Sequence, residues 1–233
     1  LVTPFDASGQ IDFPAFERNS TNRRAAGVSG WVTCGSTGEY NLMTDAERES
    51  VLRFVKDFAK PGETLIAGTN APSTAGVIAN TRRARELGYD TVLLAVPFYT
   101  KPTQAEIVRH FKAVLDAANV NIVLYSYPDK DGVEIGWEAL DGLADHPRII
   151  GIKESSGSLQ RAIGIATRYE GRIQLVSGSD DIALDFMLWG ADSWICGPAN
   201  CMARAVCDLD RTFRAGDLSG AKAIMTRIWP AMN

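Results

Sequence analysis

Residue types that metal and redox sites depend on are scarce in this chain of 233 residues. It has two histidines, His110 and His146, which are too few for a three-histidine metal site. None of the four cysteines forms a Cys-x-x-Cys pair, so we expect reduced, partly buried thiols and a cytoplasmic protein. No apolar run reaches the length of a membrane-spanning helix. We expect neither a metal ion nor another cofactor.

An excess of charge of one sign is also lacking. The chain has 24 Lys and Arg against 28 Asp and Glu, with a formal net charge of −4 at pH 7, and the two signs are interleaved. Nucleic acid and anionic membranes are therefore not expected partners. The hydrophobic content of 45% is ordinary for a globular protein and supplies a large core.

What the chain does have is a regular alternation of strand-like and helix-like segments. Eight short apolar runs read as buried strands: residues 1–3, 30–34, 65–68, 91–96, 121–125, 149–153, 173–177 and 193–196. Helical periodicity fills the intervals, and two helices begin with a capping box, Thr44 with Glu47 and Thr103 with Glu106. Eight such alternations predict an α/β protein with a single (β/α)8 TIM barrel domain over residues 1–233. An open doubly wound sheet is the alternative, although it usually has fewer strands.

One segment does not follow this pattern. Residues 19–24 fall where the first helix should carry an apolar stripe, yet all six are polar or charged. We expect a helix there that is either poorly packed or largely solvated.

Lys153 is the residue with the clearest chemical meaning. It closes the apolar run 149–153, and burying an unpaired ammonium group there would be costly. A desolvated lysine amine is a good nucleophile for a ketone and forms a Schiff base with it. Its pKa would have to fall from about 10.4 toward about 7–8. The ordinary alternative is a lysine that snorkels from the strand end to solvent.

The other strand ends supply what this chemistry needs, because active sites of barrels lie at the carboxyl ends of their strands. Tyr125 ends the neighbouring run and can pass protons to the carbinolamine. Gly35-Ser36-Thr37-Gly38 offers backbone N–H groups and hydroxyls for a carboxylate. The alternatives are a tight turn at 35–38 and simple aromatic packing of Tyr99 and Tyr125. Asp180-Asp181 is expected to be the acidic first turn of a helix rather than a metal site.

These motifs together resemble one family. Thr3-Pro4-Phe5, Gly35-Ser36-Thr37-Gly38-Glu39, Pro97-Phe98-Tyr99, Tyr125 with Pro128, Gly151-Ile152-Lys153-Glu154, and Gly178 with Asp180-Asp181 follow in the order and spacing of the dihydrodipicolinate synthase/N-acetylneuraminate lyase family. The resemblance covers the whole chain. It implies a (β/α)8 barrel of class I lyases, usually homotetrameric, with a C-terminal helical region. We expect that this extension and the start of the first strand are largely missing here.

The resemblance also implies roles for individual residues. Lys153 matches the Schiff-base lysine and Tyr125 the general acid/base, while Ser36 and Tyr99 match the rest of the proton relay. In the synthase, the counterpart of Tyr99 comes from across the tight dimer interface. Ser36 and Thr37 match the pair that binds the substrate carboxylate in the family. Gly178 and Ile195 match positions whose backbone lines the family's substrate pocket.

The loop after Tyr125 departs from the synthase. There the synthase has an arginine that holds the carboxylate of the aldehyde substrate, whereas this chain has Lys130, followed by Asp131. Lysine keeps the charge but loses the bidentate fork. We therefore expect Lys130 to bind the second substrate less specifically.

The sequence thus predicts a Schiff-base lyase or synthase that acts on pyruvate or a substituted 2-oxo acid.

Three alternatives stay open at this point. The first is a relative within the family, namely a 2-keto-3-deoxy sugar-acid aldolase or dehydratase, or a hydroxypyrroline-carboxylate deaminase. The second is a non-catalytic barrel that binds a 2-oxo acid, which would not need the set Lys153, Tyr125, Tyr99 and Ser36. The third is a metal-dependent aldolase, which the two histidines disfavour. The expected partners are a small 2-oxo acid and further copies of the chain.

Overall fold

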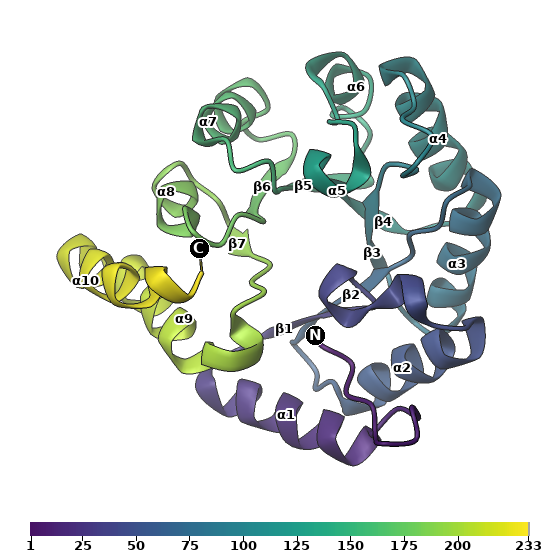
Figure 1. Cartoon of the computed structure of the whole chain (residues 1–233). Helices are drawn as coiled ribbons and strands as arrows, with labels where there is room; N and C mark the ends of the chain where they lie inside the picture. The colour runs from purple at the N-terminus through teal and green to yellow at the C-terminus, as the bar shows by residue number, and fades with distance from the viewer. Residues whose placement is uncertain (233) are drawn as a thin grey trace.

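A curled sheet of seven parallel strands forms the centre of the molecule (Figure 1). The computed structural model describes residues 1–232. The strands lie side by side in chain order: β1 (Gly30–Thr33), β2 (Thr64–Gly68), β3 (Thr91–Ala95), β4 (Asn121–Ser126), β5 (Ile149–Glu154), β6 (Gln174–Ser177) and β7 (Ser193–Trp194). This arrangement confirms the expected parallel α/β architecture.

Helices surround the sheet on its outer side (Figure 1). They are α1 (Phe13–Ala26), α2 (Asp45–Phe58), α3 (Thr74–Glu86), α4 (Gln104–Ala117), α5 (Pro128–Asp131), α6 (Trp137–Asp141), α7 (Leu159–Arg168), α8 (Ala183–Leu188), α9 (Ala199–Arg214) and α10 (Leu218–Ile228). Short 3₁₀ turns are η1 (Ser36–Gly38), η2 (Tyr40–Leu42) and η3 (Trp229–Ala231). Both predicted capping boxes are present, at the starts of α2 and α4.

The predicted strand over residues 1–3 is wrong, so residues 1–232 contain seven of the eight predicted strands. This segment is held by single hydrogen bonds instead of a ladder. The Leu1 nitrogen donates to the Val32 carbonyl oxygen at 2.9 Å, and the Val2 N–H donates to Asn200 Oδ1 at 3.1 Å. Pro4, which follows, has no N–H to extend a ladder.

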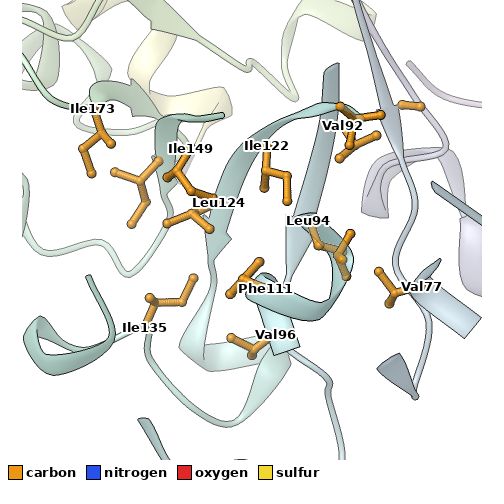
Figure 2. Packing of buried hydrophobic residues seen from close by; sticks show 14 of the residues in the cluster. Val77, Val92, Leu94, Val96, Phe111, Ile122, Leu124, Ile135, Ile149 and Ile173 are labelled. Atoms are coloured by element: carbon orange, nitrogen blue, oxygen red, sulfur yellow. The ribbon is translucent and has the colours of Figure 1, made fainter. Parts of the chain in front are cut away.

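The strands separate two apolar layers because successive side chains point to opposite faces. On β4, Ile122 and Leu124 face outward, where they join residues of β3, β5 and α4 in the main core (Figure 2). Val123 and Tyr125 of the same strand face the enclosed side and pack with Leu93 and Val176. The predicted site residue Tyr125 therefore lies on the interior of the curl.

Half of the residues of the first helix are exposed, as its polar sequence led us to expect, but the helix also has a buried face. Phe16, Ser20, Arg23 and Ala26 are buried at helical spacing along one face of α1. The Arg23 Nη2 donates to the carbonyl oxygen of Asn200 at 3.1 Å, at the start of α9. Polar side chains thus form the packed face, which hydrophobicity patterns cannot detect.

A buried ion pair fixes the end of β5. Glu154 is fully buried, and its Oε2 accepts a hydrogen bond from Arg161 Nε of α7 at 2.7 Å. Its Oε1 accepts the Ser156 N–H at 2.7 Å. Arg161 also donates to Glu134 Oε2 at 2.9 Å and to the Ile135 carbonyl oxygen. The pair therefore joins β5, the loop after it and the segment before α6.

Breaking this pair should destabilise the fold strongly. Arg161→Met leaves the Glu154 carboxylate buried without its cation, so we expect the free energy of unfolding in urea to fall by about 3–5 kcal/mol. The double variant Glu154→Leu/Arg161→Met should recover much of that loss. The exposed pair Arg214–Asp210 is the control, and its removal should have far less effect. If removing the exposed pair lowered the free energy of unfolding as much as removing the buried pair, the special contribution of the buried pair would be contradicted.

Candidate active site

Lys153 and Tyr125 lie opposite each other on neighbouring strands. Their Cα positions are paired in the register of β4 and β5, and the Lys153 Nζ lies 4.2 Å from the centroid of the Tyr125 ring. The sequence placed these two residues on adjacent strands, and the structure brings them into contact. A phenol and an amine on the inner face of the curl are thus available to the same bound molecule.

The Lys153 amine is desolvated. Burial lowers its pKa from 10.5 to about 8. Asp180 and Cys196 act in the opposite direction, while the positive charge of Lys130 lowers the pKa further. At neutral pH roughly a tenth of the amine would be in the nucleophilic free-base form. This is the direction that nucleophilic lysine chemistry requires.

The Tyr125 phenol is kept neutral. It is 5% exposed, and burial raises its pKa above the ordinary value. The negative charge of Asp131 adds to this effect, whereas the hydroxyls of Ser36 and Ser155 near the phenol oppose it. Ser36 comes from η1 after β1, so the structure brings it to Tyr125 as the sequence predicted. Ser155 was not predicted, although it follows Lys153 by only two residues.

The segment 35–38 forms a short 3₁₀ turn at the end of β1. The Gly38 N–H donates to the Gly35 carbonyl oxygen at 2.9 Å, and the Glu39 N–H donates to the Ser36 carbonyl oxygen at 3.1 Å. The N–H groups at the start of such a turn have no partner within it, so those of Ser36 and Thr37 can serve an anion. Thr37 is exposed and Ser36 half-buried, so both can be reached by a bound molecule.

Gly178 lies directly beside the lysine. A Cβ atom at this position would stand 2.0 Å from Ser155 Oγ and 2.8 Å from Lys153 Cγ, so any larger residue would displace them. The Gly178 N–H donates to the Glu154 carbonyl oxygen at 2.9 Å. Ile195 packs against the inner cluster that contains Tyr125, and its N–H donates to the Ser177 carbonyl oxygen at 3.0 Å. Both predicted lining positions therefore surround Lys153 and Tyr125.

Asp180 has a different place from the one expected. It precedes α8, which begins at Ala183, so it is not the acidic first turn of that helix. Its Oδ1 accepts a hydrogen bond from Trp194 Nε1 at 2.8 Å, and burial raises its pKa. Its charge acts directly on Lys153. Asp180 follows β6 and is held by Trp194 of β7, and no local sequence pattern shows its proximity to Lys153.

Tyr99 is the one predicted relay residue that this chain does not bring to the others. It lies in the loop after β3 with φ of 74° and is 90% exposed. Within the described residues, no hydrogen bond connects it to Ser36 or Tyr125. A large aromatic side chain held outside in a left-handed conformation is unusual for a residue that only packs.

Lys130 and Asp131 are the last two residues of α5, which follows Tyr125 along the chain. Lys130 is exposed, and its Nζ lies 5.2 Å from the centroid of the Tyr127 ring. Asp131 is 8% exposed, and burial raises the pKa of its carboxyl group to about 7. The sequence indicated Lys130 as a substrate contact, while the burial of Asp131 at the next position was not foreseen.

Over residues 1–232, no group of three or more His, Cys, Asp or Glu side chains is arranged to hold a metal ion. In the same part of the chain, no helix is both long and apolar enough to cross a membrane.

A curled parallel sheet with a desolvated lysine amine beside a buried phenol at its strand ends defines an α/β protein with a buried lysine–tyrosine site. The sequence profile of the Dihydrodipicolinate synthetase family matches residues 1–233, and the chain belongs to this family.

Individual relatives agree with this assignment. The chain is similar to proteins named 4-hydroxy-tetrahydrodipicolinate synthase from an Exiguobacterium species (34% identity, 100% of this chain and 80% of that protein) and from Trichlorobacter lovleyi (38%, 96% and 77%). The structure is similar to the crystal structure of the chloride-inhibited dihydrodipicolinate synthase from Acinetobacter baumannii complexed with pyruvate. That match has a TM-score of 0.96 at 32% identity and covers 100% of this chain and 80% of the other.

Removing either of two charges near Lys153 should shift its pKa, in opposite directions. Asp180→Asn removes a charge that raises this pKa, so the pKa should fall and the amine should become reactive at a lower pH than in the wild type. Lys130→Ala removes a charge that lowers this pKa, so the pKa should rise and the amine should become reactive only at a higher pH. Competitive acetylation as a function of pH, read by mass spectrometry of the Lys153 peptide, measures both. Exposed Lys60 in the same digests is the control, and shifts of the same sign in both variants would contradict the assignment.

Proposed function

We propose that this protein is a Schiff-base-forming lyase or synthase that acts on pyruvate or a substituted 2-oxo acid. The observation that carries the proposal is the desolvated Lys153 amine, which has a pKa of about 8. Its Nζ lies 4.2 Å from the centroid of the Tyr125 ring. Membership of the Dihydrodipicolinate synthetase family supports it, as does the pyruvate complex of a similar structure.

In the first steps, the neutral Lys153 amine attacks the ketone carbon and forms a C–N bond. The carbonyl oxygen takes up a proton and later leaves as water, while the nitrogen loses protons to give the imine. Tyr125 is placed to give and take these protons because its phenol is neutral and lies beside the amine. Ser36, whose hydroxyl lies near the phenol, can extend this proton path. The protonated imine then withdraws electrons as a bond next to it forms or breaks.

The carboxylate of the 2-oxo acid would bind at η1. The N–H groups of Ser36 and Thr37 and their hydroxyls can donate hydrogen bonds to it there. Gly178 leaves room for the substrate beside Lys153, and Ile195 closes the apolar side of the pocket. This assignment fixes the direction of the substrate: its carboxylate points to the end of β1, and its variable part points toward α5 and Lys130.

Tyr99 would complete the relay in a neighbouring subunit. It is exposed and held outward by its backbone, which suits a residue that inserts into a second copy. The active form would therefore be at least a dimer, with a tetramer as the common arrangement in the family.

The same proposal includes a closed (β/α)8 barrel of one domain over residues 1–233, in which residues 1–3 take the place of the eighth strand although they form no ladder here. The bonds from Leu1 to Val32 on β1 and from Val2 to Asn200 at the start of α9 support it.

Trapping experiments test the proposal directly. Borohydride reduction in the presence of pyruvate should add the ligand mass to the Lys153 peptide, because the imine becomes a stable secondary amine. We expect the same adduct after exhaustive chelation of divalent metals. A matched digest of Lys153→Ala is the control. No adduct with pyruvate or with a wider panel of 2-oxo acids, or an adduct on another lysine, would refute the mechanism.

Hybrid oligomers test the role of Tyr99. Tyr99→Phe and Lys153→Ala should each be inactive, the first for lack of the relay and the second for lack of the amine. After the two proteins are mixed, some subunits pair an intact Lys153 with an intact Tyr99 from the partner, so activity should partly return. If subunit exchange is demonstrated by native mass spectrometry and activity does not return, Tyr99 acts in its own subunit or not at all.

A further inference from the structure

Two carboxylates lie near the end of β5, and they differ in what binds them. Glu154 is paired with the guanidinium of Arg161, so a cation in direct contact compensates its charge. Asp180 is bound by a neutral group instead, because its Oδ1 accepts a hydrogen bond from Trp194 Nε1 at 2.8 Å. Within residues 1–232, no lysine or arginine lies in ion-pair contact with Asp180. Its negative charge therefore remains available to other groups.

The turn that carries Asp180 lies against the lysine. It begins at Gly178, where a Cβ atom would stand 2.8 Å from Lys153 Cγ. The next residue, Ser179, accepts the Gly157 N–H on its Oγ at 3.2 Å, which joins the turn to the loop after β5. Asp180 follows directly, and among the charges that act on Lys153 its effect is the largest. The contacts of the turn and the electrostatics thus agree.

Trp194 fixes the position of this carboxylate. It lies on β7, paired with Ser177 in the register of β6 and β7, so its backbone belongs to the sheet. Gly197 restrains the second carboxylate oxygen, because a Cβ atom there would stand 3.1 Å from Asp180 Oδ2. Burial raises the pKa of Asp180, while the N–H groups of Trp194 and Gly197 oppose this effect and favour the ionised form. An indole N–H holds a carboxylate without supplying a positive charge.

We propose that Trp194 is a positioning residue for Lys153: with a neutral donor, it holds an uncompensated Asp180 carboxylate beside the lysine. This carboxylate stabilises positive charge on the lysine nitrogen, both in the protonated amine and in the protonated imine of a bound 2-oxo acid. The part that concerns the imine rests on the proposed function. An apolar pocket disfavours a cation, and a nearby opposite charge offsets that cost.

The other titratable groups near Lys153 and Asp180 do not supply such a charge. They are Tyr125, Lys130, Asp181, Cys196 and the amino group of Leu1. Burial raises the pKa of the phenol and of the thiol, so both are neutral near pH 7. Lys130 lowers the pKa of Lys153, and Asp181 raises that of Asp180. Among the described residues, Asp180 is thus the carboxylate whose charge acts on the lysine.

A double-mutant cycle on the free protein tests the positioning role. Competitive acetylation of the Lys153 peptide over a range of pH gives the pKa of its amine in the wild type, Trp194→Phe, Asp180→Asn and the double variant. Asp180→Asn should lower this pKa by roughly one unit. Trp194→Phe should lower it by a smaller amount, because the released carboxylate moves away or takes up a proton. In the Asp180→Asn background, Trp194→Phe should have no further effect, because Trp194 acts through Asp180.

Trp31→Phe is the matched control. The Trp31 Nε1 donates to Glu63 Oε2 at 2.8 Å, but Glu63 is paired with Arg24 and does not act on Lys153. Both tryptophan variants should lower the Tm, whereas only Trp194→Phe should shift the pKa of Lys153.

Two outcomes overturn the positioning role. One is a lower Tm of Trp194→Phe with an unchanged pKa of Lys153, which is the result of a purely structural residue. The other is an equal pKa shift from Trp194→Phe with and without the Asp180 carboxylate. If Trp194→Phe does not fold, Trp194→Met takes its place, because methionine also lacks the donor and fills the space flexibly.

Cyanoborohydride trapping tests the effect on the imine, since this reagent reduces the protonated form. At saturating pyruvate, trapping on Lys153 should decline at a lower pH in Trp194→Phe and Asp180→Asn than in the wild type, and at the same pH in Trp31→Phe. An unchanged pH profile in the first two variants overturns the stabilisation of the imine. If the wild type gives no pyruvate adduct at any pH, the proposed function fails, whereas the acetylation cycle still decides whether Trp194 positions Asp180.

Discussion

The buried ion pair between Glu154 and Arg161 is the interaction on which the site depends most. Glu154 follows Lys153 on β5, so the contacts that hold Glu154 also hold the backbone that carries the amine. Arg161 of α7 also bonds to the segment before α6, so it connects α7 and that segment to the end of β5. Removing either partner would leave a buried charge without compensation, so the intact pair helps to hold the end of β5 in place. The lysine is placed by a rigid element rather than by a loop.

The reactivity of that lysine follows from where β5 lies. The inner face of the curl is lined by Leu93, Val123 and Val176, which leave the amine little water. Burial lowers the pKa of Lys153 to about 8, and the opposing charges of Asp180 and Lys130 adjust it. Similar burial keeps the Tyr125 phenol neutral. One apolar environment thus has opposite effects on an amine and a phenol, and it leaves both uncharged forms available for proton transfer.

One difference from the synthase pattern lies on α5, where the chain has Lys130 followed by Asp131. Under the proposed function, η1 would bind the carboxylate of the 2-oxo acid, and α5 would face the rest of the substrate. The relatives named 4-hydroxy-tetrahydrodipicolinate synthase share 34% and 38% identity with this chain.

The sequence alone determined the parallel α/β architecture and seven of the eight predicted strands, because strand periodicity and capping boxes are local signals. An amine at the end of an apolar run also pointed to Lys153, and the neighbouring run to Tyr125. The expectation for Gly178 and Ile195 came from the resemblance to the family, and their roles stay predictions. Only the tertiary structure decided that residues 1–3 form no strand, that α1 packs through Ser20 and Arg23, and that Asp180 and Asp131 are buried beside the site. Burial and the electrostatic field of distant residues arise when separate strands and helices come together, so no short segment of sequence contains them.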